Sequence, residues 1–157
     1  MKIIVFRAKT LLIICLIIGV LLSTLYTPAV QSVFSASNGR SLPIYSVQTE
    51  EKKVAIGINC AWDDSDIPAM LSCLAEQEVN ATFFLLGEWA EKYPVSAATI
   101  AKSGQEIGSH SYSHRDLDGL SQSEILNEIS QSQQSIQKAC GQTPVLFRPP
   151  SGSYNDT

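Results

Sequence analysis

The two histidines of this 157-residue chain, His110 and His114, lie four residues apart in the segment HSYSH. Two imidazoles at this spacing on a helix or a tight turn can direct nitrogen atoms at one point, as a divalent transition metal requires. The alternative is a pair of polar residues in a surface turn. Because the segment directly follows a predicted strand, where the site of a βα unit would lie, the position favours the metal site.

A second candidate is Arg148, which precedes the segment PPSGSY. Proline and glycine fix a rigid loop there, and a guanidinium group at its start can orient a carboxylate or a substrate oxygen through a forked hydrogen bond. On these residues alone, an ordinary turn with a solvated Arg148 is the alternative.

Two adjacent carboxylates, Asp63 and Asp64, follow the first predicted strand. They could supply one metal ligand and one general base. Acidic residues also gather at helix starts, so helix capping is the alternative for both of them. For the nearby Asp66, capping is the interpretation that we favour.

These candidates follow strands in a chain that alternates strands with helices. Apolar, β-branched and aromatic runs predict strands at residues 52–58, 79–86, 106–109 and 145–147. Helical spacing of apolar residues predicts helices at residues 66–74, 96–102 and 121–141. Ser121 and Glu124 form a capping box at the start of the last helix. The alternation indicates parallel βαβ units, whose sites gather at the carboxyl ends of the strands.

The front of the chain differs in character from the rest. An apolar run at residues 11–22 follows three basic residues, which is the order of a signal anchor or a cleaved secretion signal. We expect this anchor or signal at residues 1–27, a Ser-rich tether at 28–51 and the folded domain at 52–157. The domain would then lie outside the cytoplasm, attached to the membrane, or secreted if the first segment is cleaved.

Charge narrows the range of partners. The first 49 residues carry four basic and no acidic side chains, whereas the remaining 108 carry seven basic and fifteen acidic ones. An acidic domain without a cluster of basic residues is a poor ligand for phosphates. Nucleic acid is therefore not an expected partner.

Together, these segments resemble the polysaccharide deacetylases of carbohydrate esterase family 4. The resemblance rests on KKVAIGI, ATFFLLGEWAEKYP, EIGSHSYSH and LFRPPSGSYN, which occur in the family's order. It implies a distorted (β/α) barrel that removes N-acetyl groups from an N-acetylglucosamine-containing polysaccharide such as peptidoglycan. It also implies a divalent metal, zinc in the first place, held by two His and one Asp, with a neighbouring Asp as base. His110 and His114 match the metal histidines, and Arg148 matches the arginine that holds the catalytic Asp.

The first motif departs from the family pattern of two adjacent Asp residues. The alignment places Asn59 on the base and Cys60 on the metal ligand. An amide cannot accept a proton as a carboxylate does. Cys60 could bind zinc as a thiolate or could be a small buried apolar residue. Asp63 as base and Asp64 as metal ligand would have to swing back from the following loop.

The length of the chain limits how much of a (β/α) barrel it can form. The 108 residues from Glu50 are fewer than the roughly 200 of a complete (β/α) barrel, so we expect only about the first four βα units. The leading hypothesis is a metal-dependent deacetylase with Asp63 and Arg148 as catalytic residues and His110, His114 and Asp64 as metal ligands. The alternatives are a catalytically inactive module that binds glycan or a partner, and a truncated fragment without function.

Overall fold

The computed structural model describes residues 13–14, 16–20 and 43–155. The chain divides into two compact units, and the larger runs from Gln48 to Asn155. Of the other unit, residues 13–14 and 16–20 are described as helical. Most of the predicted anchor and tether lies outside the described residues. Within the described part of the chain, no helix is both long enough and apolar enough to cross a membrane.

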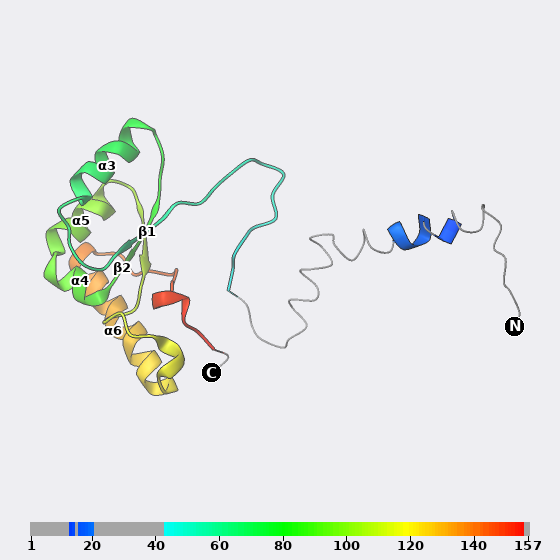
Figure 1. The fold of residues 1–157 in the computed structure, drawn as a ribbon. Coiled ribbons are helices and arrows are strands. Elements are labelled where there is room, and N and C mark those ends of the chain that lie inside the picture. The colour runs from blue at the N-terminus through cyan, green and yellow to red at the C-terminus, as the bar shows by residue number, and fades with distance from the viewer. Residues whose placement is uncertain (1–12, 15, 21–42, 156–157) are drawn as a thin grey trace, which may run out of the picture. The chain divides into compact units, whose positions relative to one another are not determined.

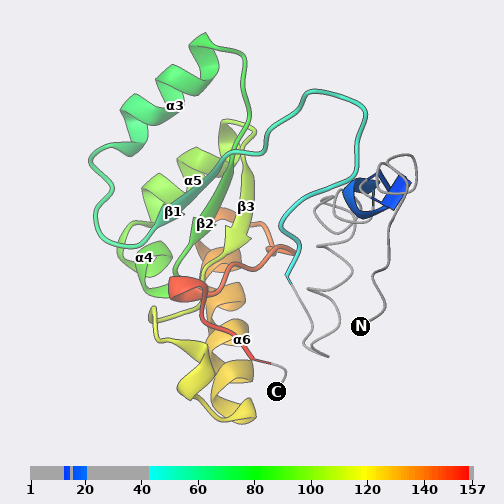
Figure 2. The same ribbon diagram turned by 45° about the vertical axis from the view of Figure 1, so that its right-hand side comes forward.

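The larger unit is built on a sheet of three parallel strands in the order β1-β2-β3 (Figure 2). The strands are β1 (Gly57–Cys60), β2 (Thr82–Leu85) and β3 (Glu106–Ser109). Their register places Cys60, Leu85 and Ser109 at the same level, so all three strands end together. A single parallel bridge between Ser109 and Phe147 extends the sheet beyond β3. The polar loops that follow the strands therefore meet at one edge.

Helices pack against one face of this sheet, with α3, α4 and α5 on the same side of it in Figure 1. Their bounds are α3 Ile67–Glu76, α4 Gly87–Lys92, α5 Pro94–Lys102 and α6 Gln122–Cys140. Two short 3-10 turns complete the unit, η1 at Leu117–Gly119 and η2 at Pro150–Gly152.

The core lies between the sheet and these helices. Alternation along β2 directs Phe83 and Leu85 into it, and both side chains are fully buried. The other large members of the core cluster come mainly from the helices: Ile67, Trp89, Ile100 and Ile136. Phe84 lies on the opposite face of the sheet, where the Arg148 guanidinium covers its ring at 4.0 Å. Both faces of the central strand are thus covered.

Two predicted elements are confirmed with their boundaries. Strand β3 spans the predicted residues 106–109. Helix α6 begins after Ser121, whose hydroxyl accepts a hydrogen bond from the Glu124 amide while the Glu124 carboxylate accepts one from the Ser121 amide. The helix ends at Gly141, which adopts a left-handed φ of 77°.

The first strand was predicted too early in the chain. Residues 52–58 were expected, but β1 begins at Gly57, and Val54 is 90% exposed. The register explains the shift, because Gly57 pairs with Thr82, the first residue of β2. Among the described residues before Gly57, only the Ile56 carbonyl still reaches that strand, where it accepts a hydrogen bond from the Thr82 amide (2.9 Å). An apolar run alone does not show which of its residues will pair with a neighbouring strand.

Three further expectations need correction. The strand predicted at residues 79–86 is shorter, Thr82–Leu85, and Gly87 soon after it begins α4, a six-residue helix that the sequence pattern did not indicate. The fourth strand at residues 145–147 is reduced to the single bridge at Phe147. Asp66 does occupy the N-cap position of α3, yet its side chain makes no capping hydrogen bond.

Gly108 provides a test of the packing on the face of the sheet that Arg148 covers. A Cβ atom at this position would lie 2.5 Å from the Phe84 ring, which is itself confined under Arg148. We expect Gly108→Ala to lower the free energy of unfolding by about 1–3 kcal/mol in urea titrations. Gly119→Ala is the matched control, because a Cβ there meets nothing within 4 Å. Equal stability of the two variants would contradict the packing described.

Candidate functional site

The histidine pair lies in the loop that follows β3. The rings of His110 and His114 have centroids 5.2 Å apart and meet edge to face at 78°. The His110 amide donates to the Leu85 carbonyl (2.9 Å), which fixes the start of the loop to β2. Left-handed backbone conformations at Ser111 (φ 76°) and His114 (φ 63°) turn the loop tightly enough to bring the second imidazole back. A turn of the loop, and not a helix, therefore brings the two histidines together.

His110 is buried, and its surroundings favour the neutral imidazole, which is the form that binds a metal. Its Nδ1 lies 2.7 Å from the Arg148 carbonyl oxygen, the contact that a protonated Nδ1 would make as a donor. Burial is the main cause that lowers the pKa of His110. The hydrogen bond to the Arg148 carbonyl acts in the opposite direction, whereas the electrostatic effects of His114 and Arg148 act in the same direction as burial. With Nδ1 occupied in this way, Nε2 is the nitrogen that remains for a metal or a substrate.

Glu128 on α6 holds the loop between the two histidines. Its carboxylate accepts hydrogen bonds from the amides of Tyr112 (3.0 Å) and Ser113 (2.9 Å). It also accepts from the hydroxyls of Ser111 (2.6 Å) and Ser113 (2.7 Å). Burial by itself would raise the pKa of Glu128, but these four hydrogen bonds outweigh it and lower the pKa below its usual range.

The sequence analysis did not identify Glu128. Ile125, Ile129 and Ile136 give α6 its helical spacing of apolar residues, yet only the last of these is fully buried. The other buried residues of the helix are Glu128, Ser132 and Ser135. Three polar residues at the spacing of one helix face were the available signal, because such a face must contact a polar partner.

Arg148 connects all three strands. Its amide donates to the Ser109 carbonyl at the end of β3 (2.9 Å), and its guanidinium covers Phe84 on β2. Nη1 donates to Oδ1 of Asn59 on β1 at 2.8 Å. Gly57 permits this path across the sheet, because any side chain there would collide with the guanidinium. The sequence predicts that Arg148 orients a carboxylate or a substrate oxygen through a forked hydrogen bond. The group that it contacts in the structure is the amide oxygen of Asn59, and its catalytic role stays a prediction.

Asp63 and Asp64 lie in the loop after β1, and they form hydrogen bonds within this loop and to α5. Asp63 is exposed and accepts hydrogen bonds from the Ser65 hydroxyl (2.6 Å) and the Asp64 amide (2.8 Å). These contacts lower the pKa of Asp63, the Ser65 hydrogen bond most of all, so the group is an anion at neutral pH. Asp64 accepts from the Ser96 hydroxyl on α5 at 2.5 Å. None of these three hydrogen bonds involves the histidine pair.

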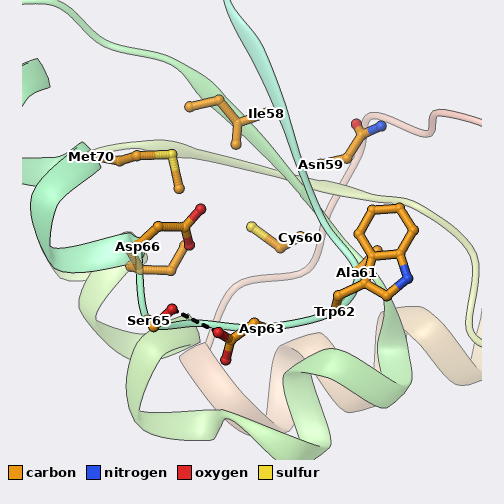
Figure 3. A pocket seen from close by; sticks show the side chains of 10 residues that line it. Ile58, Asn59, Cys60, Ala61, Trp62, Asp63, Ser65, Asp66 and Met70 are labelled. Atoms are coloured by element: carbon orange, nitrogen blue, oxygen red, sulfur yellow. Dashed lines mark hydrogen bonds between the residues drawn. The ribbon is translucent and has the colours of Figure 1, made fainter.

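Cys60 points into the core, away from Asn59. Figure 3 shows the sulfur on the side of Met70 and Asp66, with the Asn59 amide on the other side of β1. These residues belong to the wall of a cavity of about 290 Å³ between β1 and the start of α3. Burial, and secondarily the charge of Asp66, raises the pKa of the Cys60 thiol to about 12. Cys60 is therefore a neutral thiol among apolar side chains, which favours the core interpretation of this residue.

These positions determine how far the site suits a metal ion. His110 and His114 supply two suitable nitrogen donors. Across residues 13–14, 16–20 and 43–155, however, no group of three or more His, Cys, Asp or Glu side chains is placed to hold a metal. A zinc site of the family type needs a third protein ligand. The described residues therefore supply two of the three protein ligands that such a zinc site needs, and the third is missing among them.

A parallel sheet with its polar groups gathered where the strands end places the chain among α/β proteins, in which ligand sites commonly lie at that edge. A family model described as "Polysaccharide deacetylase" matches residues 46–157, and the chain belongs to this family. The resemblance stated from the sequence motifs is thereby confirmed.

Curated relatives include both characterised and uncharacterised members. The chain is 39% identical over 112 residues to the uncharacterized protein YlxY of Bacillus subtilis, covering 71% of this chain and 35% of that protein. It is 37% identical over 115 residues to the peptidoglycan-N-acetylmuramic acid deacetylase PdaC of the same organism, with 71% and 24% covered. The chain thus spans about a quarter to a third of the length of these relatives.

Solved structures include an inactive relative. A CE4 family pseudoenzyme from Bacillus anthracis has a TM-score of 0.67 and 37% identity, covering 69% of this chain and 39% of that one. A mutant of that pseudoenzyme with restored enzymatic activity also has a TM-score of 0.67 and 37% identity, with 69% and 40% covered. The Bc1960 peptidoglycan N-acetylglucosamine deacetylase has a TM-score of 0.65 and 34% identity, with 68% and 50% covered.

The Glu128 contacts predict a pH-dependent contribution to stability. A carboxylate whose pKa is lowered by folding stabilises the fold above its unfolded pKa of about 4.3, and this contribution is lost as the pH falls through the folded value. We expect Glu128→Gln to lower the free energy of unfolding by about 2 kcal/mol at pH 7 and by clearly less near pH 3.5. Urea titrations at both pH values measure this difference. The exposed Glu88 supplies the control Glu88→Gln, and a Glu128→Gln effect independent of pH would contradict the assignment.

Proposed function

We propose that this chain forms the glycan-recognising part of a polysaccharide deacetylase domain and binds N-acetylated cell-wall polysaccharide of the peptidoglycan type without hydrolysing it. The observation that carries the proposal is the hydrogen bond from Arg148 to Asn59, which places an amide where the family pattern has its base. In this proposal the domain lies outside the cytoplasm, attached to the membrane through residues 1–27 or secreted after their cleavage.

Recognition is supported by the groups that remain at the ends of the strands. Arg148 and His114 are half-buried, Asn59 is exposed, and all three carry polar atoms suited to hydroxyl and acetamide groups. The names of relatives give the substrate class, since PdaC is a peptidoglycan-N-acetylmuramic acid deacetylase and others are peptidoglycan-N-acetylglucosamine deacetylases. We extend that class of glycan to this chain.

The absence of hydrolysis is supported by the chemistry of the first motif. The amide of Asn59 has no basic lone pair with which to take a proton at neutral pH. Cys60 is a buried thiol that points to the opposite side of β1. The chain therefore offers neither of the two groups that the family pattern places at these positions.

Hydrolysis is the second candidate, and one observation favours it. Asp63 is an exposed anion three residues after the end of β1, so a movement of this loop could bring a base toward the histidine pair. In this candidate Asp63 and Arg148 are the catalytic residues, and His110, His114 and Asp64 hold a divalent metal such as zinc. The loop would have to break the hydrogen bonds from Ser65 to Asp63 and from Ser96 to Asp64.

Binding and acetate release separate the two candidates. We expect the purified protein to bind chitotetraose, a tetramer of N-acetylglucosamine, in isothermal titration calorimetry and to release no acetate from it. Arg148→Ala should weaken binding at least about fivefold, since a charged hydrogen-bond donor to a ligand contributes roughly 1–3 kcal/mol. The exposed Lys102 at the end of α5 supplies the control Lys102→Ala.

Acetate release that a chelator stops and that Asp63→Asn abolishes would overturn the non-hydrolytic proposal in favour of the second candidate. Absence of both binding and acetate release would contradict both.

Zinc binding tests the donor set independently of activity. We expect His110→Ala and His114→Ala each to weaken zinc binding at least about tenfold, because each removes half of the available imidazole donors. Cys60→Ser should leave zinc affinity nearly unchanged, since the thiol faces the core. Calorimetric titration with zinc measures these three variants and the double variant His110→Ala, His114→Ala. Zinc retained stoichiometrically by the double variant would contradict the role of the two histidines as zinc donors. A strong loss of zinc affinity in Cys60→Ser would show that the thiol is a ligand.

A further inference from the structure

The two tryptophans of the chain lie in opposite environments. Trp89 on α4 is 2% exposed, and its indole N–H donates to the Asp63 carbonyl at 3.1 Å. Trp62, two residues after the end of β1, is 78% exposed. An exposed indole leaves a large apolar surface in water, so the position of Trp62 beside the candidate site calls for an explanation.

Trp62 is part of that site by position. Its ring centroid lies 5.9 Å from that of His114, and the two planes are tilted by 48°. Trp62 and Asn59 both contribute to the wall of the cavity at the end of β1. In Figure 3 the indole lies on the Asn59 side of the strand, away from Met70 and Asp66. An aromatic face thus adjoins the amide held by Arg148 and the second imidazole.

This combination matches the two kinds of surface on a pyranose ring. One face of a β-linked N-acetylglucosamine unit carries mainly C–H groups, and its rim carries hydroxyl and acetamide groups. An indole covers the C–H face without satisfying any polar group, while nearby amide, guanidinium and imidazole groups can bind the rim. A tryptophan in this place costs little conformational entropy on binding, because it has only two side-chain torsions.

We propose that Trp62 is the stacking platform for one sugar ring of an N-acetylated glycan chain. The inference rests on the proposed function and adds to it the residue that provides the apolar contact. Polar side chains alone bind neutral sugars weakly, because water competes for the same hydrogen bonds. The aromatic face supplies the part of the binding for which water does not compete.

The test combines calorimetry with tryptophan fluorescence on the purified protein, with chitotetraose as the probe. We expect Trp62→Ala to weaken binding about tenfold and Trp62→Phe, which keeps a smaller aromatic face, to weaken it less. The control is Val95→Ala on α5, which removes another exposed apolar side chain. We expect iodide to quench Trp62 in the free protein and chitotetraose to protect it, while the buried Trp89 is little affected in either state.

The outcomes distinguish this inference from the proposed function. Unchanged chitotetraose affinity in Trp62→Ala, or iodide quenching unaffected by the sugar, would overturn the role of Trp62 while glycan binding stands. Failure of the unmodified protein to bind chitotetraose would overturn the proposed function and this inference with it. Equal losses in Trp62→Phe and Trp62→Ala, accompanied by a fall in thermal stability, would indicate a structural role for the indole and also overturn the inference.

Discussion

The candidate site depends on one side chain, because Arg148 makes contact with each strand of the sheet. Its amide is bound at the end of β3, its guanidinium lies over a ring of β2, and its Nη1 reaches the amide of Asn59 on β1. Its carbonyl oxygen meets Nδ1 of His110. The planar guanidinium can cover the Phe84 ring and donate to Asn59 at the same time. The single ammonium group of a lysine would not reproduce both contacts. Arg148 thus links the first motif to the histidine loop, in addition to the strand pairing and to the hydrogen bond from the His110 amide to Leu85.

The identity of Arg148's partner changes the electrostatics of the site. A carboxylate opposite Arg148 would neutralise the guanidinium and would itself be held ionised. The amide of Asn59 accepts the same hydrogen bond at 2.8 Å but carries no charge. The site therefore retains a net positive group next to a histidine pair of which one member is already kept neutral by burial. Such a site suits polar and anionic ligand groups better than proton abstraction.

The parts that could be predicted from the sequence are those with local causes. The capping box at Ser121 and the left-handed Gly141 specify both ends of α6 without reference to other elements. The bounds of β1 depend on where β2 begins, which lies 25 residues away at Thr82, and no local pattern contains that information. For Glu128 the polar face of α6 was a local signal, but the identity of its partners was not. Its four hydrogen bonds come from three residues of a loop that only tertiary packing brings to the helix.

The first motif also shows why adjacent residues need not act together. Successive side chains of a strand point to opposite faces, and Asn59 and Cys60 both belong to β1. Asn59 accordingly faces Arg148, while Cys60 is 3% exposed in the core beneath α3. A ligand at position 60 could turn toward the histidines only if the strand ended one residue earlier. The Leu86 amide opposes this, because it donates to the Cys60 carbonyl at 3.1 Å and holds the residue in the sheet. The sheet therefore places Asn59 on the side of Arg148 and keeps Cys60 in the core, away from the histidine pair.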